Sequence, residues 1–123
     1  MAKVLVVDDE IEILELVCDE MKRQGHFVVA ARSPNVALDL LKLRSNQFDL
    51  VICDVVMPQR NGLDFVHEAN RIKHFKGEIA MMSSYVTMLD KDIQDAGVKH
   101  VIKKPFTLEA LIGLTQNLRP AKA

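Results

Sequence analysis

The chain has 123 residues, of which 49% are hydrophobic and 27% are charged, a balance typical of one globular domain. Its net charge of −1 provides no basic field of the kind that drives binding to nucleic acid or to an anionic membrane. No apolar run is long enough to cross a bilayer, and the N-terminus lacks the long apolar region of a secretory signal.

The two cysteines, Cys18 and Cys53, form neither a CxxC pair nor a metal-binding spacing. Both lie in apolar stretches of the sequence. We therefore expect both cysteines to be reduced core residues of a cytoplasmic protein.

The first half of the chain alternates short β-branched runs with longer amphipathic segments. Residues 4–7 form an apolar run of strand length, as in parallel strands covered on both faces. Residues 10–24 carry apolar side chains at helical spacing, and Gly25 follows where a left-handed cap belongs. Residues 27–30 predict a second strand. Ser33 then stands at an N-cap position before a proline, which predicts the start of the second helix.

The second half repeats the alternation. It predicts strands at 50–53, 79–82 and 101–102, and helices at 62–75, 87–97 and 107–118. Thr87 and Asp90 would form a capping box at the fourth helix. Five strands alternating with five helices predict a doubly wound α/β domain with a parallel sheet. We expect this domain to span residues 1–119, with a short tail at 120–123.

Polar residues collect at the ends of the predicted strands. Asp8 and Asp9 follow the first strand, Asp54 the third, Ser83 the fourth and Lys104 the fifth. Because parallel strands end at one edge of the sheet, where open α/β sheets bind ligands, these side chains should converge on one pocket.

The chemistry of that pocket favours phosphoryl transfer. Two carboxylates about 4 Å apart repel by roughly 4 kcal/mol at an effective dielectric of 20, so they must take up protons or bind a cation. Oxygen ligands suit a hard divalent ion such as Mg²⁺ or Mn²⁺, and no His or Cys clusters with them as zinc would require. A lysine and a serine hydroxyl can both contact phosphate oxygens.

Four motifs in this order carry a family resemblance. They are Val-Val-Asp-Asp-Glu (6–10), Cys-Asp-Val-Val-Met-Pro (53–58) followed by Asn-Gly (61–62), Met-Ser-Ser (82–84) and Lys-Pro-Phe (104–106). Together they resemble the response-regulator receiver domains of two-component signalling, and the resemblance covers nearly the whole chain. It implies a flavodoxin-like (βα)5 fold with sheet order 2-1-3-4-5.

The resemblance also implies the role of each site residue. Asp54 would accept a phosphoryl group from a sensor histidine kinase or a histidine phosphotransfer protein. Asp9, Asp54 and the backbone carbonyl of Val56 would hold the metal, with Asp8 nearby through water. Ser83 would bind the phosphoryl group and Lys104 would pair with it.

Further expectations concern the output surface. The resemblance implies a cis Lys104–Pro105 peptide and output through the face made by the last two helices and the fifth strand. The output partner would be another protein, a missing effector domain or a second copy of this domain. Val101 stands where the family often has an aromatic residue, so a switch would depend more on the Ser83 loop. Val56 and Tyr85 would shield the acyl phosphate from water.

Three other functions remain as alternatives. A pseudo-receiver would signal by protein contact without phosphorylation, but it would not need the acidic set and the lysine. A phosphohydrolase would commonly place a second Asp where Val56 stands, so no enzyme activity beyond self-catalysed transfer and dephosphorylation is expected. A flavin or nucleotide carrier would need a glycine-rich loop, and neither GxGxxG nor GxxxxGK[ST] occurs.

Overall fold

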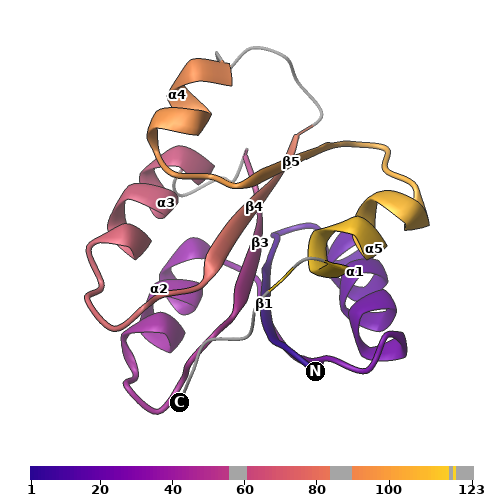
Figure 1. Ribbon diagram of the computed structural model, residues 1–123, viewed down its shortest axis with the longest axis horizontal. Helices are drawn as coiled ribbons and strands as arrows, with labels where there is room; N and C mark the ends of the chain where they lie inside the picture. Colours follow the sequence, from indigo (N-terminus) through magenta and orange to yellow (C-terminus); the bar gives the residue numbers. More distant parts are fainter. Residues whose placement is uncertain (56–60, 84–89, 117, 119–123) are drawn as a thin grey trace.

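The computed structural model describes residues 1–55, 61–83, 90–116 and 118. Its centre is a parallel sheet (Figure 1), as the sequence pattern predicted, and the strand order is β2-β1-β3-β4-β5, as the resemblance implied. The strands are β1 (Lys3–Val7), β2 (Phe27–Ala31), β3 (Leu50–Asp54), β4 (Glu78–Ser83) and β5 (His100–Lys103).

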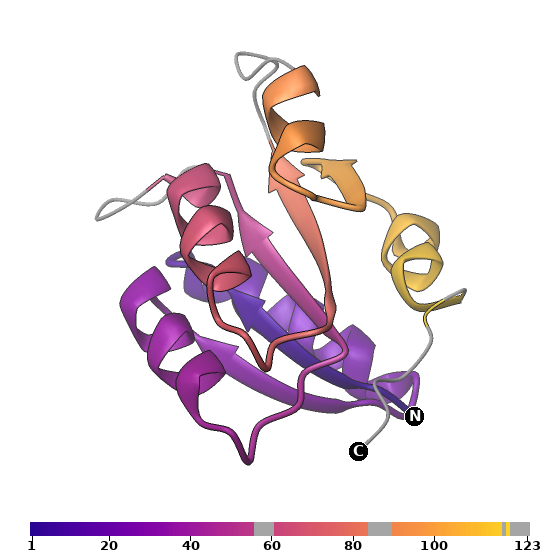
Figure 2. The same ribbon diagram turned by 60° about the vertical axis from the view of Figure 1, so that its left-hand side comes forward.

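Helices cover both faces of this sheet. Within the described residues they are α1 (Ile11–Arg23), α2 (Pro34–Lys42), α3 (Gly62–Asn70), α4 (Asp90–Asp95) and α5 (Leu108–Gln116). Two views agree that α1 and α5 lie on one face and α2, α3 and α4 on the other (Figure 1; Figure 2). The doubly wound α/β architecture is therefore confirmed. No helix among the described residues is long and apolar enough to span a membrane.

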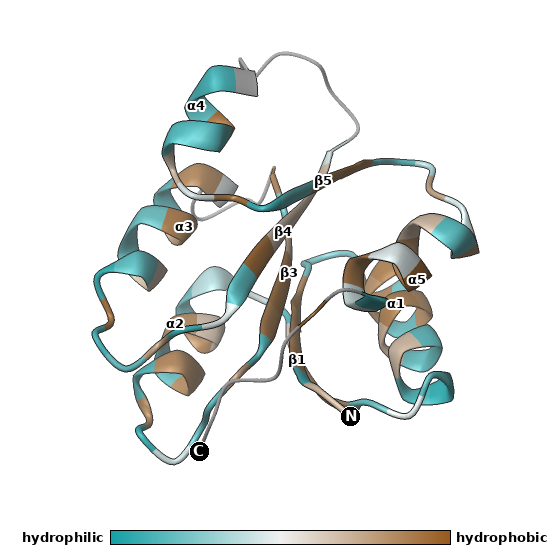
Figure 3. Cartoon of the chain, viewed as in Figure 1, coloured by the Kyte–Doolittle hydropathy of each residue, from teal (hydrophilic) through white to brown (hydrophobic). Residues whose placement is uncertain are grey.

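The sheet divides the hydrophobic interior into two clusters. The first lies between the sheet and the α2, α3 and α4 helices, and it includes Leu41, Phe65 and Met81. The second faces α1 and α5 and includes Val17 and Leu111. Every residue of β3 is buried, since both its neighbours and both helical layers surround it. Brown, hydrophobic positions follow the central strands and the inner faces of the helices (Figure 3).

Local signals in the sequence explain where the first two helices are bounded. The Ser33 hydroxyl accepts a 3.2 Å hydrogen bond from the Val36 N–H, as an N-cap should. Gly25 has φ +92°, a left-handed conformation that glycine adopts without steric cost. Cys18 and Cys53 are both buried and unbridged, as expected from their apolar surroundings.

The third helix is shorter than predicted. It ends at Asn70 rather than at residue 75, although Ile72 and Phe75 still pack against the first cluster. The N–H groups of Ile72 and Phe75 each bond a carbonyl three residues earlier, at 3.1 Å, so the chain continues in turns. Apolar spacing therefore overestimated the helix, because turns can also direct side chains to the core.

The remaining boundaries differ from prediction by a few residues at most. The start predicted for the fourth helix, at Thr87, lies outside the described residues, and the described part of α4 begins at Asp90. The α5 helix begins one residue after Thr107, whose hydroxyl accepts a 3.2 Å hydrogen bond from the Ala110 N–H. Such shifts are usual at helix ends.

Candidate functional site

The carboxyl ends of β1 and β3 place two aspartates side by side. Asp8 follows β1, and its N–H extends the ladder with a 3.1 Å hydrogen bond to the Ala31 carbonyl. Asp54 is the last residue of β3 and lies opposite Met82 in the register. The next N–H, of Val55, donates to the Met82 carbonyl at 2.9 Å. Regular backbone pairing thus holds both carboxylates at one edge of the sheet.

The adjoining ends of β4 and β5 supply a lysine and a serine. The Lys104 N–H donates to the Ser83 carbonyl at 2.8 Å, which fixes the lysine just beyond β5. Its ammonium nitrogen lies 3.0 Å from Asp54 Oδ2 and 3.2 Å from Asp8 Oδ2. All three side chains are nearly enclosed, with exposures of 10% for Lys104, 7% for Asp54 and 0% for Asp8. The ammonium therefore bridges two buried carboxylates.

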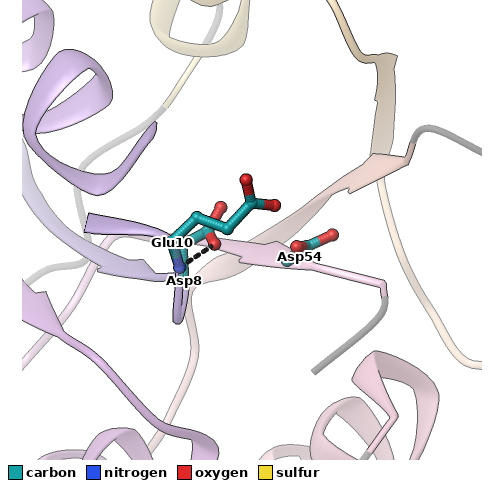
Figure 4. Close-up of side chains that lie close together, drawn as sticks. All are labelled: Asp8, Glu10 and Asp54. Atoms are coloured by element: carbon teal, nitrogen blue, oxygen red, sulfur yellow. Dashed lines mark hydrogen bonds between the residues drawn. The ribbon is translucent and has the colours of Figure 1, made fainter. Parts of the chain in front are cut away.

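A third carboxylate, that of Glu10, completes the cluster. Oxygen atoms of Asp8, Glu10 and Asp54 all lie within 4.8 Å of one another. Figure 4 shows the Glu10 side chain extending from the Asp8 side of the site towards Asp54. The Lys104 nitrogen is 3.6 Å from Glu10 Oε1, and Glu10 is 62% exposed. The cluster thus consists of three nearly enclosed groups, Asp8, Asp54 and Lys104, and one exposed carboxylate, that of Glu10.

Burial and charge shift two pKa values in the site. Burial raises the pKa of Asp8, and the nearby Asp54 charge adds to this, although the Glu10 N–H and Lys104 partly oppose it. Burial disfavours the Lys104 ammonium, but its hydrogen bonds and charge interactions with Asp54 and Asp8 outweigh this and raise its pKa. Lys104 therefore stays charged at neutral pH.

The donor set suits a hard divalent cation. The cluster offers three carboxylates, and neither histidine nor cysteine belongs to it within the described part of the chain. Three carboxylates and one ammonium sum to a charge of −2, which a single Mg²⁺ or Mn²⁺ would neutralise. Oxygen ligands, one of them on the exposed Glu10 side chain, match the preference of Mg²⁺, which keeps several of its waters. The residues present fit such an ion.

Most of the predicted residues lie at this edge. Lys104 contacts both Asp8 and Asp54 directly, and oxygens of the two aspartates lie within 4.8 Å, as the convergence of strand ends predicted. Ser83 is buried at the end of β4, at the same edge. Asp9 is half-buried and is not part of the carboxylate cluster, so its role as a ligand stays a prediction.

Two predicted contributors, Val56 and Tyr85, lie outside the described residues. Sequence reasoning missed Glu10, which looked like the first residue of a helix. Its place directly after two acidic residues at a strand end was the available signal. The Lys104–Pro105 peptide is cis, as the resemblance implied.

A close backbone approach supports the Asp54 end of β3. The Gly62 N–H donates to the Val55 carbonyl at 2.6 Å, and Asn61 caps α3 by accepting from the Asp64 N–H at 2.8 Å. A Cβ atom on Gly62 would collide with the Asp54 carbonyl and lie 2.8 Å from the Val55 Cα. A glycine is therefore required where α3 starts beneath the site.

The chain matches the response regulator receiver domain family over residues 4–116. It belongs to this family. The receiver domain is 31% identical to chemotaxis protein CheY4 of Vibrio cholerae, over 97% of this chain and 99% of that one, with a TM-score of 0.86. It is 29% identical to response regulator TrrA of Thermotoga maritima, over 97% and 100% of the two chains, with a TM-score of 0.81. The TrrA structure is a complex with Mg²⁺-BeF. A receiver domain of Methylobacillus flagellatus, 18% identical, shares the fold over 97% and 99% of the chains with a TM-score of 0.85.

Proposed function

We propose that this receiver domain is a phosphorylation-gated switch that accepts a phosphoryl group on Asp54 from a histidine kinase or phosphotransfer protein. The observation that carries the proposal is the contact between Asp54 and Lys104, 3.0 Å apart, inside a cluster of carboxylates. A lysine held against an acceptor carboxylate supplies the positive charge that a phosphoryl group needs. Such donors obtain their phosphoryl group from ATP. We therefore propose that the protein acts in the cytoplasm, where ATP is present.

In the proposed step, a carboxylate oxygen of Asp54 attacks the phosphorus of a phosphohistidine. An O–P bond forms, the N–P bond breaks, and its electron pair returns to the imidazole, which then takes up a proton from solvent. Asp54 sits on a fully buried strand, so its attacking oxygen is held in position before the donor arrives. The chain acts on itself only, through this transfer and the later loss of phosphate to water.

The carboxylates would hold Mg²⁺ or Mn²⁺, with Asp54, Asp9 and the Val56 carbonyl as ligands and Asp8 nearby through water. When bound, the ion neutralises charge that develops on the phosphoryl oxygens. The buried Asp8 carboxylate contributes negative charge at a fixed point, because its other oxygen accepts a 2.9 Å hydrogen bond from the Glu10 N–H. Ser83 would donate its hydroxyl proton to a phosphoryl oxygen.

Phosphorylation would add a charge of about −1.5 to −2 beside Lys104. The added group biases two pre-existing conformations, and the face formed by α4, β5 and α5 would transmit the difference. Val101 is 48% exposed on β5, so a branched aliphatic side chain stands on that face. The output partner would be another protein, an effector domain or a second copy of the receiver domain.

The proposal is tested by exposing the purified chain to acetyl phosphate and Mg²⁺ and measuring its mass. We expect the parent to gain one phosphoryl group and Asp54→Asn to gain none. Asp39→Asn, an exposed aspartate on α2, serves as the matched control and should label like the parent. If the parent stays unmodified both with acetyl phosphate and with a phosphorylated histidine kinase, the pseudo-receiver would be the better description.

A further inference from the structure

Glu10 is not among the metal ligands that the family resemblance implies, yet its carboxylate belongs to the same cluster. We propose that Glu10 is a third carboxylate of the divalent-cation site, contacting the ion directly or through one of its waters. The inference rests on the proposed metal site and adds a residue to it. It is drawn from the position of the Glu10 carboxylate, whose oxygen lies within 4.8 Å of oxygens of Asp8 and Asp54.

The backbone around Glu10 is fixed on both sides. Its N–H donates to Asp8 Oδ1 at 2.9 Å, and its carbonyl accepts the first α1 hydrogen bond, from the Leu14 N–H, also at 2.9 Å. Only the side chain can therefore adjust its position, and its Cα stays beside Asp8.

The side chain does not serve the helix that it precedes. Glu10 occupies the N-cap of α1, with φ −83° and ψ 108°, but makes no side-chain capping bond. Ser, Thr, Asp and Asn are the residues that usually accept from the first N–H groups of a helix. Here a longer carboxylate stands at that position and is directed away from the helix, towards Asp54 (Figure 4).

Charge supports the same assignment. Asp8, Asp54 and Lys104 alone sum to −1, and the Glu10 carboxylate adds a further negative charge beside them, which favours a divalent cation at this edge. The Lys104 nitrogen is 3.6 Å from Glu10 Oε1, farther than from either aspartate, so Glu10 is the carboxylate that the ammonium holds least closely. Because Glu10 is 62% exposed, it can meet an ion that still carries water.

Direct Mg²⁺ titration by calorimetry, without any phosphodonor, tests the role of Glu10. We expect Glu10→Gln to raise the Kd roughly tenfold, as for residues that orient or extend a metal shell. The control is Glu12→Gln, the same change at an acidic residue in the first turn of α1, and its Kd should change less than about twofold. Unfolding midpoints measured in EDTA would establish that each variant is folded.

A second variant distinguishes two roles for Glu10, a metal ligand or a negative charge that acts on the ion from a distance. Glu10→Asp keeps the charge but withdraws the carboxylate by one methylene, so a ligand should lose affinity and a background charge should not. We expect Glu10→Asp to bind Mg²⁺ more weakly than the parent. Relaxation of water protons by bound Mn²⁺ separates the two kinds of contact. It should be greater in Glu10→Gln than in the parent if water replaces a directly bound carboxylate, and unchanged if Glu10 contacts the ion through water.

The outcomes distinguish this inference from the proposed function. Equal affinities for Glu10→Gln and Glu12→Gln, or parental affinity in Glu10→Asp, would overturn the role of Glu10 while leaving the metal site intact. A parent that binds no divalent cation would overturn both.

Discussion

Without a divalent cation, we expect Asp8→Asn to be more stable than the parent near neutral pH. Asp8 is fully buried, and one of its oxygens lies within 4.8 Å of oxygens of two other carboxylates. Asparagine has nearly the same shape, and its carbonyl oxygen can still accept the hydrogen bond that Asp8 Oδ1 receives from the Glu10 N–H. The substitution therefore removes the charge and keeps this hydrogen bond, but it loses the one that Lys104 donates to Asp8 Oδ2.

The magnitude follows from the distances. At an effective dielectric of 20, attraction to Lys104 at 3.2 Å is worth about 5 kcal/mol. Repulsion from Asp54, within 4.8 Å, costs at least about 3 kcal/mol on the same scale. Desolvation of a buried ion costs several kcal/mol more. Repulsion and desolvation together exceed the attraction to Lys104, so the ionised Asp8 carboxylate destabilises the folded state. Asp8→Asn should therefore raise the free energy of unfolding by roughly 1–3 kcal/mol.

The raised pKa of Asp8 gives the pH dependence. Since the folded-state pKa lies above the ordinary value of 3.8, protonation of Asp8 favours the folded state. That stabilisation is complete below the ordinary value and is lost as pH rises through the folded pKa. The advantage of Asp8→Asn should accordingly be largest near neutral pH and should disappear in acid.

Urea unfolding followed by circular dichroism in EDTA, at a series of pH values, measures this difference. Adding Mg²⁺ should stabilise the parent, because the ion binds only the folded state. The difference in unfolding free energy between Asp8→Asn and the parent should then become smaller. Asp8→Asn that is no more stable than the parent at neutral pH, or a gain that persists unchanged in acid, would refute the reasoning.

Two further substitutions test the surroundings of the site. Lys104→Met keeps an unbranched stem but leaves two buried carboxylates without their ammonium, so it should cost about 3 kcal/mol of unfolding free energy in EDTA. Urea titration with and without Mg²⁺ measures that cost, and a neutral effect would contradict the bridging role of Lys104. Gly62→Ala should cost about 2 kcal/mol, because its methyl group meets the backbone of Asp54 and Val55, and should slow labelling of Asp54 by acetyl phosphate. Gly113→Ala, where nothing lies within 4 Å, is the control and should unfold at or above the parental midpoint.

The architecture was predictable because the sequence signals for the central strands are not ambiguous. The apolar runs of β1 and β3 are buried from Val4 to Val7 and from Leu50 to Cys53, as strands between two helical layers must be. Convergence of Asp54 and Lys104 followed from topology alone, since parallel strands end at a common edge whatever their loops do.

Details that depend on side-chain direction were not predictable in this way. Glu10 follows two aspartates at the start of a helix, and spacing cannot say whether its carboxylate caps the helix or turns towards the site. The end of α3 was placed too late because Ile72 and Phe75 continue the apolar spacing from turns that follow Asn70. Boundaries and rotamers depend on tertiary contacts that short-range patterns do not contain.

The partition of the interior by the sheet has a consequence for how this domain can change over generations. Side chains that pack beneath α2, α3 and α4 belong to a different cluster from those beneath α1 and α5. Energetic effects of substitutions in groups that do not touch are usually additive. Each helical layer can thus change in sequence without compensating replacements in the core beneath the other layer.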